Sequence, residues 1–440
     1  MTPSPERVAS IMLSWHALDL VSCTTLQKLW AGYGQICAIT ARARSKEAAI
    51  NIKKLCGVKP VLGTDDAGSI YPLILKLISS PASGSSSTNG SEDEGHLRKM
   101  FSYEVEQYFY SGIVPRLGDD VAVAKCLDST RGMQGKEGVE ELGGLMATIM
   151  ADLRPAYPVA GGKRSALNRT QVHGALHWLA GFHSRSWGLL SETERKTSEA
   201  LDGYILPPLE ESRRRTESAS KHTERNGLWL NGGYTYLATR RKEYASLVED
   251  DDSEWSEALC TPVKGTSLSI AEMAALFLTP CGRPMESYIH GDVKSENLFT
   301  TNDGDEVKVA FFDFQYVGLG LGVCDLAKLF TCSVPLGMLL DDGDGDDGYV
   351  PEELTMRDGE RKLLELYRAR LLQDRGHGSS HSYEWEEFQR HWETALVDWC
   401  RFQASWGFWG NTEWLEARVR SILGDQGWRD WLYKGISHRL

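Results

Sequence analysis

The chain has 440 residues, enough for two or three domains, and carries a formal net charge of −13 at neutral pH. This acidic excess argues against nucleic acid or an anionic membrane as the main partner, and no apolar stretch is long enough to span a bilayer. The nine cysteines contain no C-x-x-C pair and the N-terminus has no basic segment followed by an apolar one, so we expect reduced thiols and a cytoplasmic location.

The first predicted elements are a helix and two strands joined at glycines. Residues 5–20 have the pattern of a short amphipathic helix. Segment 26–40 then has the pattern strand, glycine turn, strand, with Gly32 and Gly34 in the turn. Because glycine has no Cβ, such a turn lets the backbone approach a phosphate group, although many ordinary hairpins have the same pattern.

The next predicted strand, 70–78, contains one charged residue. Lys76 lies in the middle of this apolar run, where burial of an unpaired ammonium group is costly. Lys76 therefore either faces water on an edge strand or has an acidic partner. The helix predicted at 96–112 offers Glu104 and Glu106, which cannot both face inward because two residues correspond to about 200° of helix rotation.

A change in composition marks an insert within the first part of the chain. Segment 79–95 is rich in serine and glycine, ends in acidic residues, and is predicted to be a disordered insert. The apolar runs 121–127 and 144–150 are predicted to be the last two strands of a small sheet. The first lobe should end shortly after these strands. We therefore predict a first lobe over residues 1–155 and a second, mainly helical lobe over 156–440.

Two helices of the second lobe attract attention. One is predicted at 167–187, and His183 lies on its apolar stripe, so we expect a packed core histidine there and not a catalytic base. The other lies in the C-terminal third, where tryptophans recur every seven residues on one helical face. They pack in the core or, beside Asp398, form an aromatic wall for a cationic or flat ligand. These tryptophans are Trp385, Trp392, Trp399 and Trp406.

An acidic loop at 341–348 is compatible with two readings. Its aspartates suggest a calcium loop, but an aspartate occupies the sixth position, where an EF-hand loop requires glycine. We therefore expect a solvated acidic loop.

The most informative stretch is His290–Phe299, which reads H-G-D-V-K-S-E-N-L-F. Asp292 and Asn297 are five residues apart in a tight loop, which turns both side chains toward one point. After a predicted hairpin, a strand at 307–312 brings Asp313 beside them. One aspartate to accept a hydroxyl proton, with an amide and a second carboxylate to bind Mg²⁺, suits phosphoryl transfer. The alternative is that these side chains only cap turns.

The motif H-G-D-x-x-x-x-N, followed by a strand ending in D-F-Q, resembles the protein-kinase-like superfamily. Within it, the chain is similar to the aminoglycoside phosphotransferase, choline kinase and ecdysteroid kinase-like branch, over residues 26–330. The resemblance implies an α+β fold of two lobes, with a small antiparallel sheet in the first and mainly helices in the second. It also implies transfer of the γ-phosphoryl group of ATP (or GTP), with Mg²⁺, to a hydroxyl group of a small molecule.

The same resemblance assigns roles in the catalytic loop. Asp292 would be the base, Asn297 and Asp313 would bind Mg²⁺, and Lys294 would meet the transferred phosphate. Asp325 begins the next helix, where it would bond the catalytic loop unless it only caps that helix. Segment 318–324, which is rich in glycine, is predicted to be pliable.

Nucleotide binding is assigned in the same way. The glycine turn would cover the phosphates, and the strand lysine would contact them while paired with a helix glutamate. The register E-x-x-F-Y favours Glu106 over Glu104 as that partner. Backbone groups of a hinge after the last strand would meet adenine. The residues assigned are Gly32, Gly34, Lys76, Glu106, Ala151 and Leu153.

Two other functions remain open from the sequence. A pseudokinase would bind a nucleotide without turnover, although it would not need the complete set of Asp292, Asn297 and Asp313. A protein kinase would need a longer activation segment that ends in A-P-E, whereas only eleven residues separate Asp313 from Asp325 here.

Overall fold

The computed structural model describes residues 3–29, 32–79, 93–190, 203–217, 227–302, 304, 306–340, 349–373 and 382–439. The chain divides into two units. The first is Met1–Ala156 with Ser212–Glu217, and the second is Tyr157–Glu211 with Ser218–Leu440. The predictions for the centre of the 79–95 insert and for the acidic loop 341–348 lie outside the described residues.

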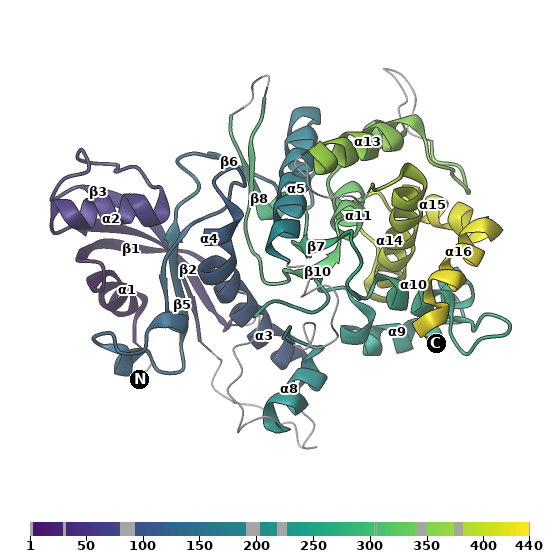
Figure 1. Ribbon diagram of the computed structural model, residues 1–440, viewed down its shortest axis with the longest axis horizontal. Coiled ribbons are helices and arrows are strands. Elements are labelled where there is room, and N and C mark those ends of the chain that lie inside the picture. Colours follow the sequence, from purple (N-terminus) through teal and green to yellow (C-terminus); the bar gives the residue numbers. More distant parts are fainter. Residues whose placement is uncertain are drawn as a thin grey trace. The chain divides into compact units, whose positions relative to one another are not determined.

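An antiparallel sheet is the centre of the first unit (Figure 1). Within the described part of this unit, the sheet has five strands in the order β1-β2-β3-β5-β4. Their bounds are Leu18–Lys28 for β1, Gly34–Ala43 for β2, Ile70–Ile78 for β3, Cys126–Ser129 for β4 and Met146–Ala151 for β5.

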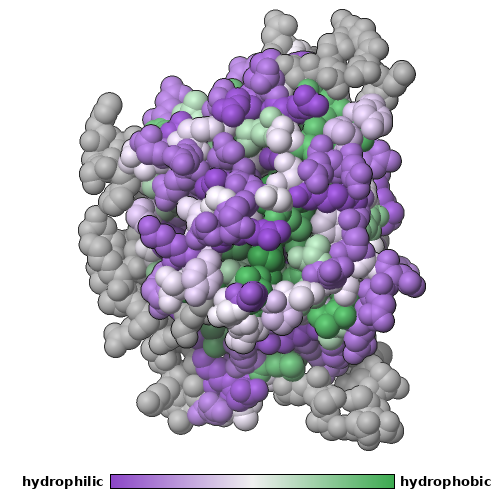
Figure 2. All heavy atoms as spheres, turned by 90° about the vertical axis from the view of Figure 1, so that its right-hand side faces the viewer, coloured by the Kyte–Doolittle hydropathy of each residue, from purple (hydrophilic) through white to green (hydrophobic). Residues whose placement is uncertain are grey.

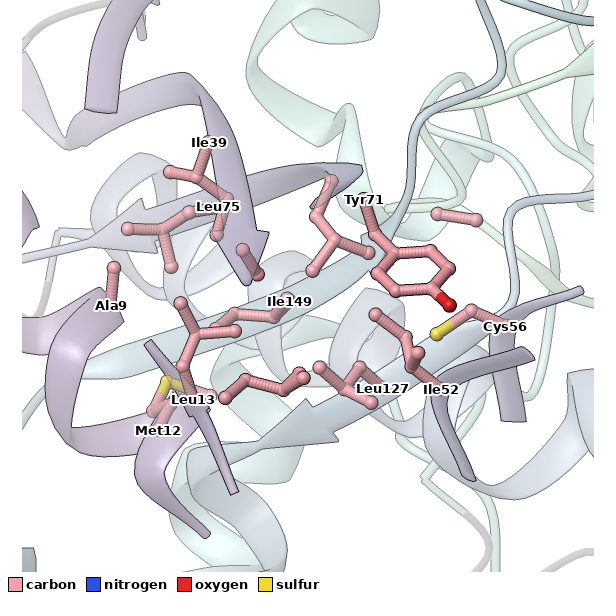
Figure 3. Packing of buried hydrophobic residues seen from close by; sticks show 14 of the residues in the cluster. Ala9, Met12, Leu13, Ile39, Ile52, Cys56, Tyr71, Leu75, Leu127 and Ile149 are labelled. Carbon is pink, nitrogen blue, oxygen red and sulfur yellow. The ribbon is translucent and has the colours of Figure 1, made fainter. Parts of the chain in front are cut away.

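Side chains alternate between the two faces of this sheet. Leu73, Leu75 and Leu77 of β3 belong to a core shared with helices α1 (Pro5–Ser14) and α2 (Lys46–Cys56). Figure 3 shows Leu75 in this core together with Leu13 of α1 and Ile52 of α2. The residues between these leucines, Lys76 among them, therefore face away from this core. The sheet thus has one dry face and one face that is available for a polar site.

Several predicted boundaries in the first unit are wrong. The predicted helix 5–20 ends at Ser14, and α2 was not predicted at all. Only the end of the predicted strand 121–127 is extended, because β4 begins at Cys126. Helix α3 (Glu94–Tyr108) begins inside the predicted insert, since the Asp93 side chain accepts a hydrogen bond from the Gly95 N–H at 2.9 Å and caps the helix.

Helix α3 continues as a π-helical turn (Phe109–Ile113) and then as α4 (Val114–Leu117). The pairing of Arg215 with Glu104 at 2.9 Å joins the end of α8 (Pro208–Glu217) to α3. Both residues of this pair belong to the first unit, which includes Ser212–Glu217.

The second unit is mainly helical. Its small strands are β6 (Val159–Ala160), β7 (Glu286–Ile289), β8 (Leu298–Thr300), β9 (Val309–Phe311) and β10 (Gly318–Leu321). Its helices are α5 (Arg169–Leu189), α9 (Arg241–Val248), α10 (Ile270–Leu278), α11 (Val323–Cys332), α12 (Leu336–Leu340), α13 (Asp358–Gln373), α14 (Trp385–Trp406), α15 (Thr412–Gly424) and α16 (Gln426–Ile436).

The glycine-rich segment after Asp313 is a strand, so the prediction of a pliable segment at 318–324 is wrong. Gly318–Leu321 forms β10 and pairs with β7. A Cβ on Gly318 would lie 2.4 Å from the Trp229 carbonyl oxygen. Glycine is required here because two backbones approach closely, not because the chain bends.

Among the described helices, none has the length and apolar character needed to cross a membrane. The face seen in Figure 2 is mainly hydrophilic, with hydrophobic side chains gathered in a narrow strip near its middle. Exposed apolar groups on this scale are ordinary for a folded protein.

One buried histidine makes the stability of the second unit depend on pH. His391 of α14 is 3% exposed, its Nδ1 lies 2.6 Å from the Tyr383 hydroxyl, and it packs against Phe277 and Trp431. Burial, with a smaller contribution from the Arg283 charge, lowers the pKa of His391 from 6.5 to about 3.

Acidification should therefore destabilise the protein. Below pH 6.5 the unfolded chain binds a proton at His391 that the folded chain excludes until about pH 3. The free energy of unfolding should fall by up to about 1.4 kcal/mol per pH unit from this group. Denaturant titrations at several pH values between 7 and 4 would give the free energy of unfolding as a function of pH. This free energy should depend less steeply on pH in His391→Gln than in the parent protein, but not in the exposed control His438→Gln. Equal slopes for all three proteins would contradict this assignment.

Candidate active site

The catalytic loop leaves strand β7 at His290 and turns sharply at Gly291. Gly291 has a φ of 83°, and a Cβ there would lie 2.3 Å from the Tyr316 carbonyl oxygen. Only glycine fits this position without displacing backbone. The turn directs the next residue, Asp292, into a cavity of the second unit.

Asp325, on helix α11, holds this turn in shape through hydrogen bonds to its backbone. Its carboxylate accepts hydrogen bonds from the N–H groups of His290 at 2.7 Å and Gly291 at 2.9 Å. No side-chain cap of α11 is formed. Asp325 thus bonds the catalytic loop, as the resemblance implied.

A buried chain of hydrogen bonds holds Asp325 in turn. His183 of α5 lies with Nε2 3.1 Å from the Asp325 carboxylate, and the Tyr367 hydroxyl of α13 lies 2.7 Å from His183 Nδ1. Burial would raise the pKa of Asp325, but the hydrogen bond and charge of His183 lower it below its ordinary value. Asp325 therefore stays ionised, and His183 is a packed core residue.

Asp292 and Asn297 are in direct contact. Asn297 Nδ2 donates to Asp292 Oδ2 and to the Asp292 carbonyl oxygen, both at 2.9 Å. The ammonium group of Lys294 lies 3.1 Å from Asp292 Oδ2 and 3.0 Å from Glu296 Oε1. The structure thus brings together the three catalytic-loop residues that the sequence singles out.

Asp313 follows the hairpin of β8 and β9, which is joined to this loop. The Phe312 N–H donates to the Asn297 carbonyl oxygen at 3.0 Å, which joins the end of β9 to the catalytic loop. Asp313 has a φ of 66°, an uncommon conformation for a residue other than glycine, and accepts a hydrogen bond from Gln315 Nε2 at 2.6 Å. Such strain is often found at functional sites.

The donor atoms beside this hairpin suit Mg²⁺. Asn297 uses its Nδ2 group toward Asp292, so its amide oxygen is the atom available to a metal, and Asp313 contributes carboxylate oxygens. Mg²⁺ binds such hard oxygens and completes its shell with water and phosphate. In the part of the chain that the structure describes, no group of three or more His, Cys, Asp or Glu side chains could hold a metal ion by itself.

His290, the first residue of the H-G-D motif, has a structural role that its place in the sequence did not indicate. Its buried ring lies with Nε2 3.0 Å from the Phe312 carbonyl oxygen, and its Nδ1 accepts from the Asp292 N–H at 3.3 Å. Burial lowers the pKa of His290, so the ring remains neutral and can make both bonds. His290 therefore positions Asp292 relative to the end of β9.

In the first unit, Lys76 and Glu106 form a buried ion pair. Lys76 Nζ lies 2.5 Å from Glu106 Oε2, and both side chains are less than a tenth exposed. Glu104 instead pairs with Arg215 at 2.9 Å. Glu106 is thus the partner of Lys76, and the pair lines a small pocket on the sheet face opposite the main core.

The other residues predicted to bind the nucleotide lie in the glycine turn and at the end of β5. Gly32 has a φ of 76° with open space around it, whereas a Cβ on Gly34 would lie 2.0 Å from the Leu77 carbonyl oxygen. Gly34 thus has a packing reason to be glycine. Ala151 ends β5 and donates its N–H to Lys125, and the Leu153 carbonyl accepts from Ala156. Their contacts with a nucleotide stay predictions.

A cavity of about 330 Å³ in the second unit contains Asp292 in its wall. This volume is at the lower end of the range for small-molecule sites. Of the tryptophan stripe on α14, Trp399 and Trp406 line the cavity, whereas Trp392 is fully buried and donates to Glu360 at 2.8 Å. Core packing is thus confirmed for Trp392, whereas a ligand contact for Trp399 and Trp406 stays a prediction. The other lining residues are Arg164, Tyr234, Val293, Lys294, Ser295, Glu296, Lys328, Cys332, Gly407, Phe408, Trp409 and Gly410.

A known family matches the larger part of this chain. The model of the ecdysteroid kinase-like family matches residues 87–345, which is more than half of the chain. The chain belongs to the ecdysteroid kinase-like family. This match confirms the resemblance expected from the H-G-D-x-x-x-x-N motif, and the two-part α+β fold expected from it is also confirmed.

Solved structures similar to this ecdysteroid kinase-like chain include three phosphotransferases or kinases. A mutant aminoglycoside phosphotransferase, solved with ADP and hygromycin B, has 11% identity and a TM-score of 0.39 and covers 96% of this chain and 98% of its own. A macrolide 2'-phosphotransferase from Brachybacterium faecium has 12% identity, a TM-score of 0.38 and 98% coverage of both chains. An ethanolamine kinase from Plasmodium vivax has 10% identity and a TM-score of 0.36, with 94% and 83% coverage.

The search of curated proteins found no match to this ecdysteroid kinase-like chain.

Proposed function

We propose that the protein is a kinase that transfers the γ-phosphoryl group of ATP to a hydroxyl group of a small molecule. One observation supports this most strongly. Asp292, held by Asn297, lines a cavity of small-molecule size, and Asp313 lies on the adjoining hairpin. The nucleotide, Mg²⁺ and a small acceptor, with no role for nucleic acid or membrane, are all parts of this proposal.

Asp292 can act as the general base through one of its two oxygens. Oδ2 already accepts a hydrogen bond from Asn297 Nδ2 and lies next to the Lys294 ammonium group. Within the described part of the chain, no hydrogen bond to Oδ1 occurs, so Oδ1 is the atom that takes the proton. As the acceptor oxygen attacks the γ-phosphorus, its proton passes to Asp292 and the bond to ADP breaks.

Asn297 and Asp313 would hold Mg²⁺, which neutralises the charge on the phosphates when bound. Lys294 supplies a fixed positive charge beside the base. Burial would lower the pKa of Lys294, but Asp292 and Glu296 together raise it above its ordinary value. Lys294 thus remains protonated and can stabilise the transferred group electrostatically.

The ion pair of the first unit would position the nucleotide phosphates. Glu106→Gln removes the charge that orients Lys76, so we expect the KM for ATP to rise about tenfold or more. Glu104→Gln is the matched control, because Glu104 contacts Arg215 and not Lys76. Steady-state kinetics at saturating acceptor would measure both. A similar rise in both variants would contradict the assignment of Glu106.

Turnover separates this proposal from a pseudokinase. Purified protein with Mg²⁺ and ATP should release ADP when a mixture of hydroxylated metabolites is added, and Asp292→Ala should not. Nucleotide binding without any Asp292-dependent turnover would favour the pseudokinase.

A further inference from the structure

We propose that the acceptor carries an anionic group in addition to its hydroxyl, and that Lys328 binds this group. This inference rests on the proposed function, since it names the chemical class of the acceptor. It concerns the cavity lined by Asp292, and no residue outside the second unit is needed for it.

Lys328 is a buried cation in the cavity wall. It lies on α11, one turn before Cys332, and is only 4% exposed. Its ammonium group donates to the Cys324 carbonyl oxygen at 3.3 Å. It forms no ion pair with any carboxylate in the described parts of the chain. The ionised Asp325 on the same helix interacts with Lys328 electrostatically but forms no ion pair with it, so a ligand anion at this position would add a direct partner for the buried charge.

The ammonium group of Lys328 lies close to the backbone of the catalytic loop. A Cβ placed on Gly233 would lie 3.5 Å from Lys328 Nζ and 3.7 Å from the Gly291 carbonyl oxygen. Lys328 Nζ therefore lies near the backbone that leads into Asp292. A molecule that places a hydroxyl at Asp292 can reach Lys328 with a second group.

None of the other charged residues that line the cavity forms an ion pair with Lys328. The charge of Lys294 is balanced by Asp292 and Glu296. Arg164 is exposed at the cavity and adds a further positive charge. The cavity therefore has an excess of positive charge, although the whole chain is acidic.

The carboxylate that could have favoured a cationic ligand is already neutralised. Asp398 lies 2.7 Å from the guanidinium group of Arg401, which also donates to the Thr235 carbonyl oxygen. Asp398 is not among the residues that line the cavity. The aromatic wall on α14 is thus paired with Lys328 and not with a free carboxylate.

Aromatic side chains define the shape of the ligand. Tyr234, Trp399, Trp406 and Trp409 line the cavity, and Lys328 Nζ lies 5.7 Å from the centre of the Trp399 ring. Flat rings are favoured between such walls. The acceptor class that fits is a planar, hydroxylated carboxylate.

Three probes with one core and different charges test this inference: para-hydroxymethyl benzoate, its methyl ester and para-hydroxymethyl benzylamine. Binding to the full chain is measured by ligand-observed NMR without nucleotide. The benzoate should bind most tightly, and Lys328→Met should weaken it by about tenfold or more. Lys328→Arg should restore binding, and the exposed Lys264→Met should leave it unchanged. Lys328→Gln replaces the methionine variant if that variant does not fold.

Each contrary result has a clear meaning. Binding of none of the probes, tighter binding of the amine, or unchanged benzoate binding in Lys328→Met would overturn the inference. Weaker Mg-ATP binding in Lys328→Met, with benzoate binding intact, would make Lys328 a nucleotide ligand instead. Because the probes are tested without ATP, the inference can fail while Asp292-dependent turnover succeeds, and the reverse.

Discussion

Asp292→Asn should lower kcat by about a hundredfold to ten-thousandfold while nucleotide affinity stays near that of the parent protein. The amide has nearly the same shape and size as the carboxylate, but it cannot accept the proton of the acceptor hydroxyl. The lysine charge beside it and the proposed Mg²⁺ ligands are unchanged. Initial rates with Mg-ATP and direct binding of the nucleotide would give both quantities.

Two further variants serve as the control and the comparison for Asp292→Asn. The exposed Asp430→Asn has the same chemistry far from the cavity wall and should leave kcat unchanged. Asp313→Ala should lose Mg-nucleotide binding together with activity, because it removes a proposed metal ligand. If Asp292→Asn and Asp313→Ala lost nucleotide affinity equally, the division into base and metal ligand would be wrong.

Asp325→Ala should destabilise the second unit by about 3–5 kcal/mol, since it leaves buried donors without an acceptor. Those donors are the His290 and Gly291 N–H groups and the His183 ring. Denaturant unfolding, followed by tryptophan fluorescence, would measure the change in the free energy of unfolding.

Asp325→Asn is the informative companion variant. The single amide oxygen of this variant can accept only some of the hydrogen bonds that the carboxylate accepts. Its loss of stability should therefore be smaller than that of Asp325→Ala but still measurable. Asp358→Ala, at the first turn of α13, changes an exposed carboxylate and should have a small effect. An Asp325→Ala protein as stable as the parent would show that the catalytic loop does not depend on this contact.

Some elements could be predicted because their signals are local. Strand β3 spans Ile70–Ile78 as predicted, since an apolar run between a polar stretch and the serine-rich segment has few other readings. The catalytic loop depends on spacing within one short segment, so its contacts between Asp292 and Asn297 followed directly.

Other elements were missed for different reasons. Helix α2 had readable signals, because Ser45 caps its start and Gly57 ends it with a φ of 66°. Strand β1 is mostly exposed and lacks alternation, so periodicity gave no reason to begin it at Leu18. The glycines of β10 suggested flexibility, but their cause is the approach of a distant segment at Trp229.

The remaining site residues depend on contacts between distant parts of the chain. The register of the sequence favoured Glu106 over Glu104, and the structure agrees, because Glu106 pairs with Lys76. The partner of Glu104 could not be predicted, because Arg215 lies more than a hundred residues further on. Lys328 looks like an ordinary helix residue in the sequence. Only the folding of α11 and α14 around the cavity shows that it is buried beside Trp399.

The most direct test of the central proposal is a mass measurement on a mixture of small molecules. The purified protein is incubated with Mg²⁺, ATP and a library of hydroxylated metabolites, and products are followed by mass spectrometry, with Asp292→Asn as control. The account predicts that at least one metabolite gains the mass of one phosphate in the parent protein and not in the control. No gain in any metabolite, together with Asp292-dependent labelling of proteins from an extract, would contradict it.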